Sequence, residues 1–442
     1  MTNSATATAG QFPVDASLPQ LLSALSDHPV VILEAPPGAG KTTRVPPALL
    51  DLPSLNGQKI LMLEPRRIAA VGAADFMARQ SGEEVGQSIG YTIRYERKVS
   101  AATRIEVVTE GVLTRRLQSD PELRGIGIVI FDEFHERNLH SDLALALCLD
   151  AQKGLRPDLK IVIMSATLES EDLARRLDNA PVISSEGWMF PVGISYVGQD
   201  VTPRSIVAAA VATTGQALQQ SEGDVLVFMP GAYEIDRTVE ALRRQHPGID
   251  ICPLYGGLSL PEQRRAIEPG CRDGRGRKVV VATNVAETSL TIEGVRTVVD
   301  CGFEKRPRFD AARGLTIFET VRISRASAKQ RAGRSGRLGP GTSYRLWSEG
   351  TQGALLPQAP PEITVADLAP LALDLAHWGV IDVDSLVWLD PPPVGHLKAA
   401  RQLLQRLGAL NDCLQLTPIG KQMAKTPAHP RLGRLLLQAQ QE

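Results

Sequence analysis

Val30-Val-Ile-Leu-Glu34 runs directly into Ala35-Pro-Pro-Gly-Ala-Gly-Lys41-Thr42-Thr43, and this stretch decides the fold. A short apolar run rich in valine and isoleucine is typical of a parallel strand that is buried on both faces. A Gly-rich turn ending in Lys-Thr, between such a strand and a helical segment, is typical of a phosphate-binding loop. The stretch therefore predicts an α/β lobe with a doubly wound sheet and an anion site at the end of this strand.

The loop offers both backbone and side-chain groups to a triphosphate. Gly38 and Gly40 allow backbone N–H groups to turn inward, and the following helix adds the positive end of its dipole. We expect Lys41 to bridge the β- and γ-phosphates, and the Thr42 hydroxyl to bind Mg²⁺. The other loop residues expected to contact the nucleotide are Pro37, Ala39 and Thr43. Ala35 departs from the usual first glycine of the pattern, and the alternative is a Gly-rich turn that binds nothing.

Two adjacent carboxylates follow another buried run, Ile126–Phe131. The carboxyl ends of strands form the ligand crevice of an open α/β sheet, and paired charges there are costly unless a cation or a reacting water uses them. We expect Asp132 to bind Mg²⁺, and Glu133 to lie beside the metal and deprotonate the attacking water. His135 either couples the site to a second lobe or caps the loop. The alternative for the acidic pair is a solvated turn.

A second set of polar residues lies in Gln330-Arg-Ala-Gly-Arg334-Ser-Gly-Arg337. On a helix, offsets of four and seven put Gln330, Arg334 and Arg337 on one face. We expect Gln330 to hold the water and the two guanidiniums to stabilise charge as the γ-phosphate departs. The alternative is an exposed basic helix. Since this segment lies in a second α/β series, the site would be complete only when two lobes close.

The order of apolar runs divides the chain into parts. Strands are predicted at 30–34, 60–64, 105–109, 126–131 and 161–165 in one lobe, and at 224–229, 249–254, 278–282, 296–300 and 343–346 in another. The predicted parts are a disordered tail at 1–14, a first lobe at 15–196, a second lobe at 197–356, a mostly helical region at 357–429 and the start of a further helical domain at 430–442. A proline-rich patch at 357–361 marks the third boundary. We expect the natural chain to continue beyond residue 442.

Composition narrows the class of protein. Hydrophobic residues make up 43 % and charged residues 22 % of the 442 residues, as in soluble globular proteins. The net charge of −1 neither favours nor excludes a nucleic-acid partner, because a basic surface can exist within a neutral total. Five dispersed cysteines without a CxxC pair favour neither a zinc site nor disulfides, and they fit a reducing cytoplasm. No apolar run reaches the roughly 20 residues that span a membrane.

Taken together, these motifs resemble those of superfamily 2 helicases of the DEAH type, and most of all the bacterial HrpB-type helicases. Further segments carry the resemblance, namely Glu64-Pro-Arg-Arg67, Thr109-Glu-Gly111, Ser165-Ala-Thr167, Leu254-Tyr-Gly-Gly-Leu258, Ala282-Thr-Asn-Val-Ala-Glu-Thr-Ser-Leu-Thr291, Leu416-Thr-Pro-Ile-Gly420 and Pro430-Arg-Leu432. Phe134 is a departure, since the family usually has alanine there. The resemblance implies two RecA-like lobes followed by a winged-helix region.

The resemblance also implies ATP as substrate, with other nucleoside triphosphates possible, and a nucleic-acid strand as partner, with RNA favoured over DNA. It implies 3′-to-5′ movement, a monomer without a membrane partner, and a hairpin between Cys301 and Ile323 with its tip at 310–314 that helps to split duplexes; the alternative is an ordinary hairpin at a lobe edge. The residues expected to contact the nucleic-acid backbone are Arg66, Arg67, Thr109, Thr288 and Thr291.

Other functions remain open at this point. A DNA helicase or translocase would use the same residues, and a nucleotide-switched scaffold would remodel a partner without unwinding nucleic acid. An adenylate-kinase-like transferase is a further alternative, but arginines in a second lobe argue against it.

Overall fold

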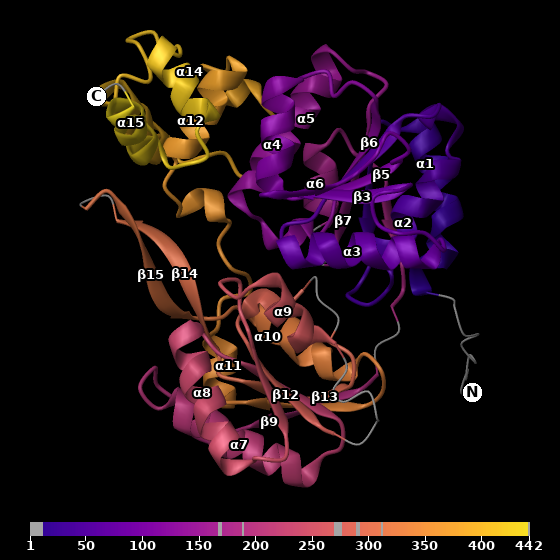
Figure 1. Ribbon diagram of the computed structural model, residues 1–442, viewed down its shortest axis with the longest axis vertical. Helices are drawn as coiled ribbons and strands as arrows, with labels where there is room; N and C mark the ends of the chain where they lie inside the picture. The colour runs from indigo at the N-terminus through magenta and orange to yellow at the C-terminus, as the bar shows by residue number, and fades with distance from the viewer. Residues whose placement is uncertain are drawn as a thin grey trace.

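A computed structural model of the chain describes residues 12–166, 170–187, 190–268, 276–288, 292–310 and 313–440. It contains two separate sheets, one parallel and one parallel except for its edge strand, each covered by helices, and a helical region next to the first sheet (Figure 1). The predicted α/β fold class, with two doubly wound lobes and an appended helical region, is confirmed. No helix in the described part of the chain is long and apolar enough to cross a membrane.

The first lobe is built on an eight-stranded sheet with the order β4-β3-β5-β2-β6-β7-β1-β8. Its strands are β1 (Val30–Glu34), β2 (Lys59–Leu63), β3 (Ile89–Ile93), β4 (Glu96–Lys98), β5 (Ile105–Val108), β6 (Ile126–Phe131), β7 (Lys160–Ser165) and β8 (Val182–Ser184). Its helices are α1 (Leu18–Asp27), α2 (Lys41–Ala48), α3 (Arg67–Gln80), α4 (Glu110–Ser119), α5 (Leu139–Gly154) and α6 (Ser170–Arg176). Successive residues of β2 enter different cores, Leu61 on one face and Met62 on the other. This double burial explains why the runs are continuously apolar.

The second lobe is built on a six-stranded parallel sheet with the order β11-β12-β10-β13-β16-β9. Its strands are β9 (Val192–Tyr196), β10 (Asp224–Phe228), β11 (Asp250–Leu254), β12 (Lys278–Ala282), β13 (Val295–Asp300) and β16 (Gly341–Arg345). Its helices are α7 (Ile206–Gln220), α8 (Ala232–Gln245), α9 (Leu260–Ile267), α10 (Arg325–Gly333) and α11 (Glu349–Ala354).

Strand β9 corrects the boundary predicted between the lobes. It pairs with β16 of the second sheet, so residues 192–196 belong there and not to the first lobe as the sequence suggested. The sequence of this strand, Val-Gly-Ile-Ser-Tyr, is half-buried or exposed throughout, as suits the edge of a sheet. A weakly apolar edge strand carries no signal that tells which of two sheets it joins.

A long antiparallel hairpin, β14 (Phe303–Asp310) with β15 (Leu315–Arg322), projects from the second lobe toward the helical region (Figure 1). It lies where the sequence predicted a hairpin, and Gly314 at its corner has a φ of +64°, which glycine adopts without strain. Of the predicted tip, residues 311 and 312 lie outside the described residues. Phe309 N donates to Val365 O at 3.1 Å, so the hairpin touches the chain that leads into the helical region.

The helical region consists of α12 (Ala369–Trp378), α13 (Val394–Arg406), α14 (Pro418–Lys425) and α15 (Pro430–Ala439). Its buried side chains form one cluster with those of the first lobe, so that Leu147 and Leu371 belong to the same core. Two polar contacts join the same parts: Trp378 Nε1 donates to Asp150 Oδ2 at 2.7 Å, and Gln118 Nε2 donates to Asp374 Oδ1 at 2.6 Å. The region is therefore packed on the first lobe, beside α4 and α5 (Figure 1).

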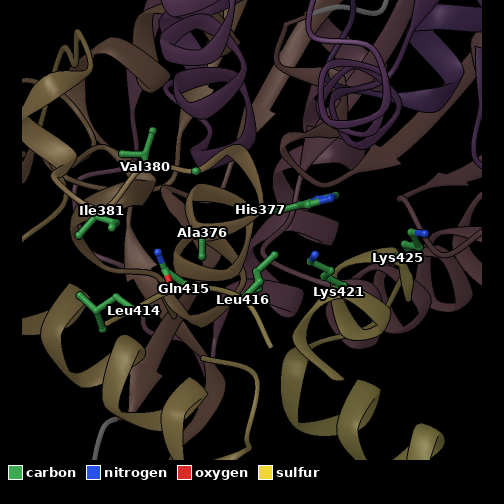
Figure 2. A pocket seen from close by; sticks show the side chains of 10 residues that line it. Ala376, His377, Val380, Ile381, Leu414, Gln415, Leu416, Lys421 and Lys425 are labelled. Carbon is green, nitrogen blue, oxygen red and sulfur yellow. The ribbon is translucent and has the colours of Figure 1, made fainter. Parts of the chain in front are cut away.

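A cavity of about 540 Å³ lies within the helical region, between the end of α12, residues 414–416 and α14. Figure 2 shows His377 and Lys421 on one side of it and apolar side chains such as Ile381 and Leu414 on the other. The residues that line it include none of those that the sequence assigns to a nucleotide. The cavity is thus separate from the site described next.

Candidate nucleotide site between the lobes

The Gly-rich loop connects β1 to α2, as its sequence predicted. Gly38 and Gly40 have φ values of +87° and +89°, in the left-handed region where a side chain would be strained. Gly40 is the N-cap of α2, and Lys41 is its first residue. A Cβ on Gly40 would also lie 2.8 Å from atoms of Phe12, so the segment before α1 packs on the loop. Phosphate at this point would meet the N-terminus of a helix.

Lys41 faces the two carboxylates at the end of β6. Its buried Nζ lies 3.2 Å from Glu133 Oε1 and 4.0 Å from Asp132 Oδ1. Burial alone would lower the pKa of Lys41, but the two carboxylates outweigh it and the pKa is raised. The lysine is therefore charged, and its ammonium group points toward Asp132 and Glu133.

Thr42 and Asp132, the two residues to which the sequence assigns Mg²⁺, are in direct contact. Thr42 Oγ1 donates to Asp132 Oδ2 at 2.5 Å. Burial raises the pKa of Asp132, although the charge of Lys41 opposes this shift. A hydroxyl and a carboxylate are the hard oxygen ligands that Mg²⁺ prefers, and Mg²⁺ in nucleotide sites takes one or two such protein groups beside phosphates. The donor set fits the metal.

Glu133 and His135 lie on the tight turn that follows β6. Glu133 has a φ of +50°, an unusual backbone conformation for a residue with a side chain. Burial would raise the pKa of Glu133, but Lys41, His135 and Arg334 outweigh it and lower the pKa to about 2. Ala166 N donates to His135 Nδ1 at 3.3 Å, so a neutral ring carries its proton on Nε2. That nitrogen lies 3.4 Å from Glu133 Oε2, which places His135 between the base and the segment after β7.

Glu64 is a site residue to which the sequence analysis gave no role of its own. It follows β2, the neighbour of β6, and its side chain is fully buried. Burial, together with the charges of Asp132 and Glu133, raises the pKa of Glu64 well above its ordinary value. The signal was available, because Glu64 ends an apolar strand just as Asp132 does.

The second lobe presents its arginines differently from the predicted helical stripe. Helix α10 ends at Gly333, and Arg334–Gly336 form a 3-10 turn, so Gln330, Arg334 and Arg337 do not share one α-helical face. A Cβ on Gly336 would lie 2.8 Å from Phe190 O, and this close packing needs a glycine at the turn. Gln330 remains on α10 and is half-buried.

Arg334 and Arg337 are nevertheless buried where the charge of Glu133, in the first lobe, acts on them. The buried Arg334 donates from Nε to Glu287 O at 2.9 Å and from Nη2 to Thr288 O. Burial lowers the pKa of both arginines, that of Arg337 to about 10, and the carboxylate of Glu133 opposes the shift in each. Glu133 is thus near enough to attract both guanidiniums across the boundary between the lobes.

Arg331 is a second residue that the sequence analysis left without a role. Its fully buried guanidinium pairs with Glu287 Oε2 at 2.8 Å and with Asp300 Oδ1 at 3.0 Å. It also lies over the ring of Phe228, 4.9 Å from the centroid. Arg331 therefore fixes the segment that holds Arg334.

The five residues expected to contact nucleic acid fall into different settings. Arg66 and Thr288 lie where the lobes touch and are hydrogen-bonded there to Glu136. Arg67 is exposed at the start of α3, and Thr109 is half-buried at the N-cap of α4. Thr291 lies outside the described residues.

Three family models match the chain in order. The model for DEAD/DEAH box helicases matches residues 16–175, the model for the helicase conserved C-terminal domain matches 208–339, and the model for the helicase-associated winged-helix domain (HA2) matches 400–428. They correspond to the first lobe, the second lobe and part of the helical region.

Individual proteins are similar over nearly the whole chain. The ATP-dependent RNA helicase HrpB of Escherichia coli (strain K12) is 50 % identical over 97 % of this chain and 53 % of its own length. The pre-mRNA-splicing factor ATP-dependent RNA helicase prp22 of Schizosaccharomyces pombe is 38 % identical over 95 % of this chain and 36 % of its own. A crystal structure of the E. coli DEAH/RHA helicase HrpB superposes with a TM-score of 0.90 at 49 % identity, over 96 % of this chain and 54 % of that one.

The chain therefore spans about half the length of HrpB, 53 %, and less of prp22. Within that span, the fold, the order of the matched domains and the sequence identity all indicate the same family. The chain belongs to the DEAH-box helicases of the HrpB type.

Proposed function

We propose that this chain is the motor of an ATP-dependent RNA helicase, which hydrolyses nucleoside triphosphates and moves 3′ to 5′ along a single strand, separating duplexes. The observation that carries the proposal is the pair of opposed walls. Lys41, Thr42, Asp132 and Glu133 form one wall within the first lobe. Arg334 of the second lobe is held by the carbonyl oxygens of Glu287 and Thr288, next to the contact of Thr288 with Glu136 on the turn of Glu133. The charge of Glu133 also opposes the lowering of the pKa of both Arg334 and Arg337.

The first wall would bind the triphosphate. The backbone N–H groups of the loop and the ammonium of Lys41 would hold the phosphates, and Thr42 and Asp132 would hold Mg²⁺. When bound, Mg²⁺ neutralises charge on the phosphate oxygens. The phosphates would compete with Glu133 for Lys41. Since Lys41 contributes to the low pKa of Glu133, this competition would raise that pKa and make the carboxylate a better base for the attacking water.

The second wall would act on the transition state. Arg334 and Arg337 would stabilise the charge that develops as the γ-phosphate departs, and Gln330 would hold the attacking water. These groups reach the site only through contact between the lobes, so hydrolysis would follow closure and product release would permit opening. His135, between Glu133 and the segment after β7, would help to position the base.

The nucleic acid would be single-stranded or partly duplex RNA, held mainly by its backbone. Both curated relatives named above are called RNA helicases. We propose that Arg67, Thr109 and Thr291 contact phosphates, and that the β14–β15 hairpin contributes to strand separation. We further propose ATP with broad acceptance of other nucleoside triphosphates, a monomeric state and a cytoplasmic location.

The test compares ATP hydrolysis with and without single-stranded RNA and DNA of equal length and sequence, at several salt concentrations. We expect RNA to stimulate turnover by about tenfold or more, and DNA less, with stimulation falling as salt rises. Equal stimulation by DNA would instead favour a DNA translocase with the same motor. A turnover rate that neither nucleic acid changes would contradict the helicase proposal and favour a nucleotide-switched scaffold.

A further inference from the structure

A single arginine of the first lobe joins the turn that carries Glu133 to the second lobe. Arg66 Nη2 donates to both carboxylate oxygens of Glu136, each at 3.0 Å. Its Nη1 donates to Asn284 O at 2.9 Å and to Val285 O at 2.7 Å. Thr288 Oγ1 donates to Glu136 Oε1. One carboxylate thus receives hydrogen bonds from both lobes.

The contacts lie in a partly buried place, where a charge-assisted bond is stronger than on the surface. The side chains of Arg66 and Glu136 are only 19 % and 13 % exposed. Nη2 of the planar guanidinium is held by the carboxylate, and Nη1 is held by two carbonyl oxygens of the second lobe, so the orientation of the guanidinium is fixed from both sides. We therefore expect that a movement of the second lobe displaces Arg66 and, through it, the turn that carries Glu136.

On the first-lobe side, the carboxylate belongs to the turn of the catalytic base. Glu136 N donates to Glu133 O at 2.9 Å, which closes the 3-10 turn Phe134–Glu136. The residues that flank this turn, Glu133 and Arg137, have φ values of +50° and +52°. A backbone held in such a conformation persists only where its surroundings fix it. A pull on Glu136 would therefore shift Glu133.

In the second lobe, Arg66 and Glu136 contact residues 284–288, and the same segment holds Arg334. Asn284, Val285 and Thr288 contact Arg66 or Glu136, while the carbonyl oxygens of Glu287 and Thr288 hold Arg334. The side chain of Glu287 pairs with the buried Arg331. Residues 284–288 are thus one short segment with contacts to both walls.

We propose that Glu136 is a positioning residue that, through Arg66 and Thr288, aligns the base Glu133 with Arg334 when the lobes close. This inference rests on the proposed hydrolysis at the site. It also changes the roles of Arg66 and Thr288, from the phosphate contacts expected from the sequence to parts of an interlobe clamp made of Arg66, Glu136, Thr288 and the carbonyls of 284 and 285.

The test compares Glu136→Gln with a control that breaks a different ion pair between the lobes. Asp75 on α3 pairs with Arg264 on α9 at 3.0 Å, and these side chains are 29 % and 49 % exposed. Asp75→Asn removes this interlobe pair without touching the turn of Glu133. For each variant, kcat and KM for ATP are measured with and without saturating RNA, and thermal unfolding is followed.

We expect Glu136→Gln to lower kcat by about tenfold or more in both conditions, with KM for ATP within about threefold, because alignment and not binding is lost. Asp75→Asn should change kcat by less than about twofold. Thr288→Val should also lower kcat, Thr288→Ser should restore it, and the Glu136→Gln/Thr288→Val double variant should lose less than the product of the two single losses.

Three results would overturn the proposal. One is a kcat for Glu136→Gln that matches Asp75→Asn, and another is a double variant whose losses multiply. The third is a Glu136→Gln variant that is altered only in its affinity for RNA, which would restore Arg66 to a phosphate contact. Suppose that the wild-type chain hydrolyses ATP and that Glu133→Gln does not. Each of the three results would then contradict the clamp and leave the proposed function standing. If the wild-type chain does not hydrolyse ATP, the proposed function fails first.

Discussion

The two walls of the nucleotide site are built in opposite ways. In the first lobe, Lys41 and Thr42 meet Asp132 and Glu133 through contacts inside one lobe, at the ends of strands of the same sheet. In the second lobe, Arg334 is held by backbone carbonyl oxygens, and the charge of Glu133 acts on it across the boundary between the lobes. If the site works as we propose, this difference means that nucleotide binding needs one lobe, whereas turnover needs both.

The largest effect is expected for a change in the first wall that removes hydrolysis and leaves ATP binding intact. Glu133→Gln keeps the size of the side chain but removes the base, so kcat should fall about 1000-fold. Binding of a fluorescent ATP analogue should persist, since Lys41 and the loop are unchanged. The measurement is steady-state hydrolysis beside equilibrium binding. A variant that retains turnover would show that another group, such as the buried Glu64, takes the proton.

A smaller effect is expected from the second wall. Arg337→Ala should lower kcat about 100-fold, with KM for ATP within about threefold, because the guanidinium acts on the transition state and Arg334 remains. Arg325→Ala, at the exposed start of α10, is the matched control and should behave as wild type. A raised KM with an unchanged kcat would mean that Arg337 binds ground-state nucleotide, and the contrast between the walls would disappear.

The smallest effect concerns the metal. Thr42→Ala removes one oxygen ligand, and the Mg²⁺ concentration for half-maximal hydrolysis should rise about tenfold. Thr42→Ser keeps the hydroxyl and should restore the wild-type value. Titration of hydrolysis with Mg²⁺ measures both variants. An unchanged Mg²⁺ requirement in Thr42→Ala would remove this hydroxyl from the metal site.

The contrast between contacts within one lobe and contacts across the two lobes also explains which features the sequence could predict. The loop at 35–43 and the pair Asp132-Glu133 were recognisable because strand, turn and helix follow each other within a few residues. The ten predicted strands and the hairpin were also placed correctly to within one or two residues, since the apolar runs are continuous and the hairpin corner carries a glycine. Strands β3, β4, β8 and β9 were not predicted.

What the sequence missed depends on partners far away in the chain. The interlobe contacts of Arg66 join residues more than 200 positions apart, and nothing local indicates them. The end of α10 at Gly333 and the membership of β9 in the second sheet likewise follow from tertiary packing, at Gly336 against Phe190 and at β9 against β16. Propensity and pattern are weak where such packing decides the conformation.

The core shared by the first lobe and the helical region has a practical consequence for anyone who wishes to study a lobe in isolation. A fragment truncated at 357–361 would lose Leu371, Leu397 and the other apolar side chains that complete the cluster containing Leu147. Apolar patches that become exposed to solvent in this way promote aggregation. We expect a soluble fragment of the first lobe to require α12 and α13 supplied with it, either fused or co-expressed.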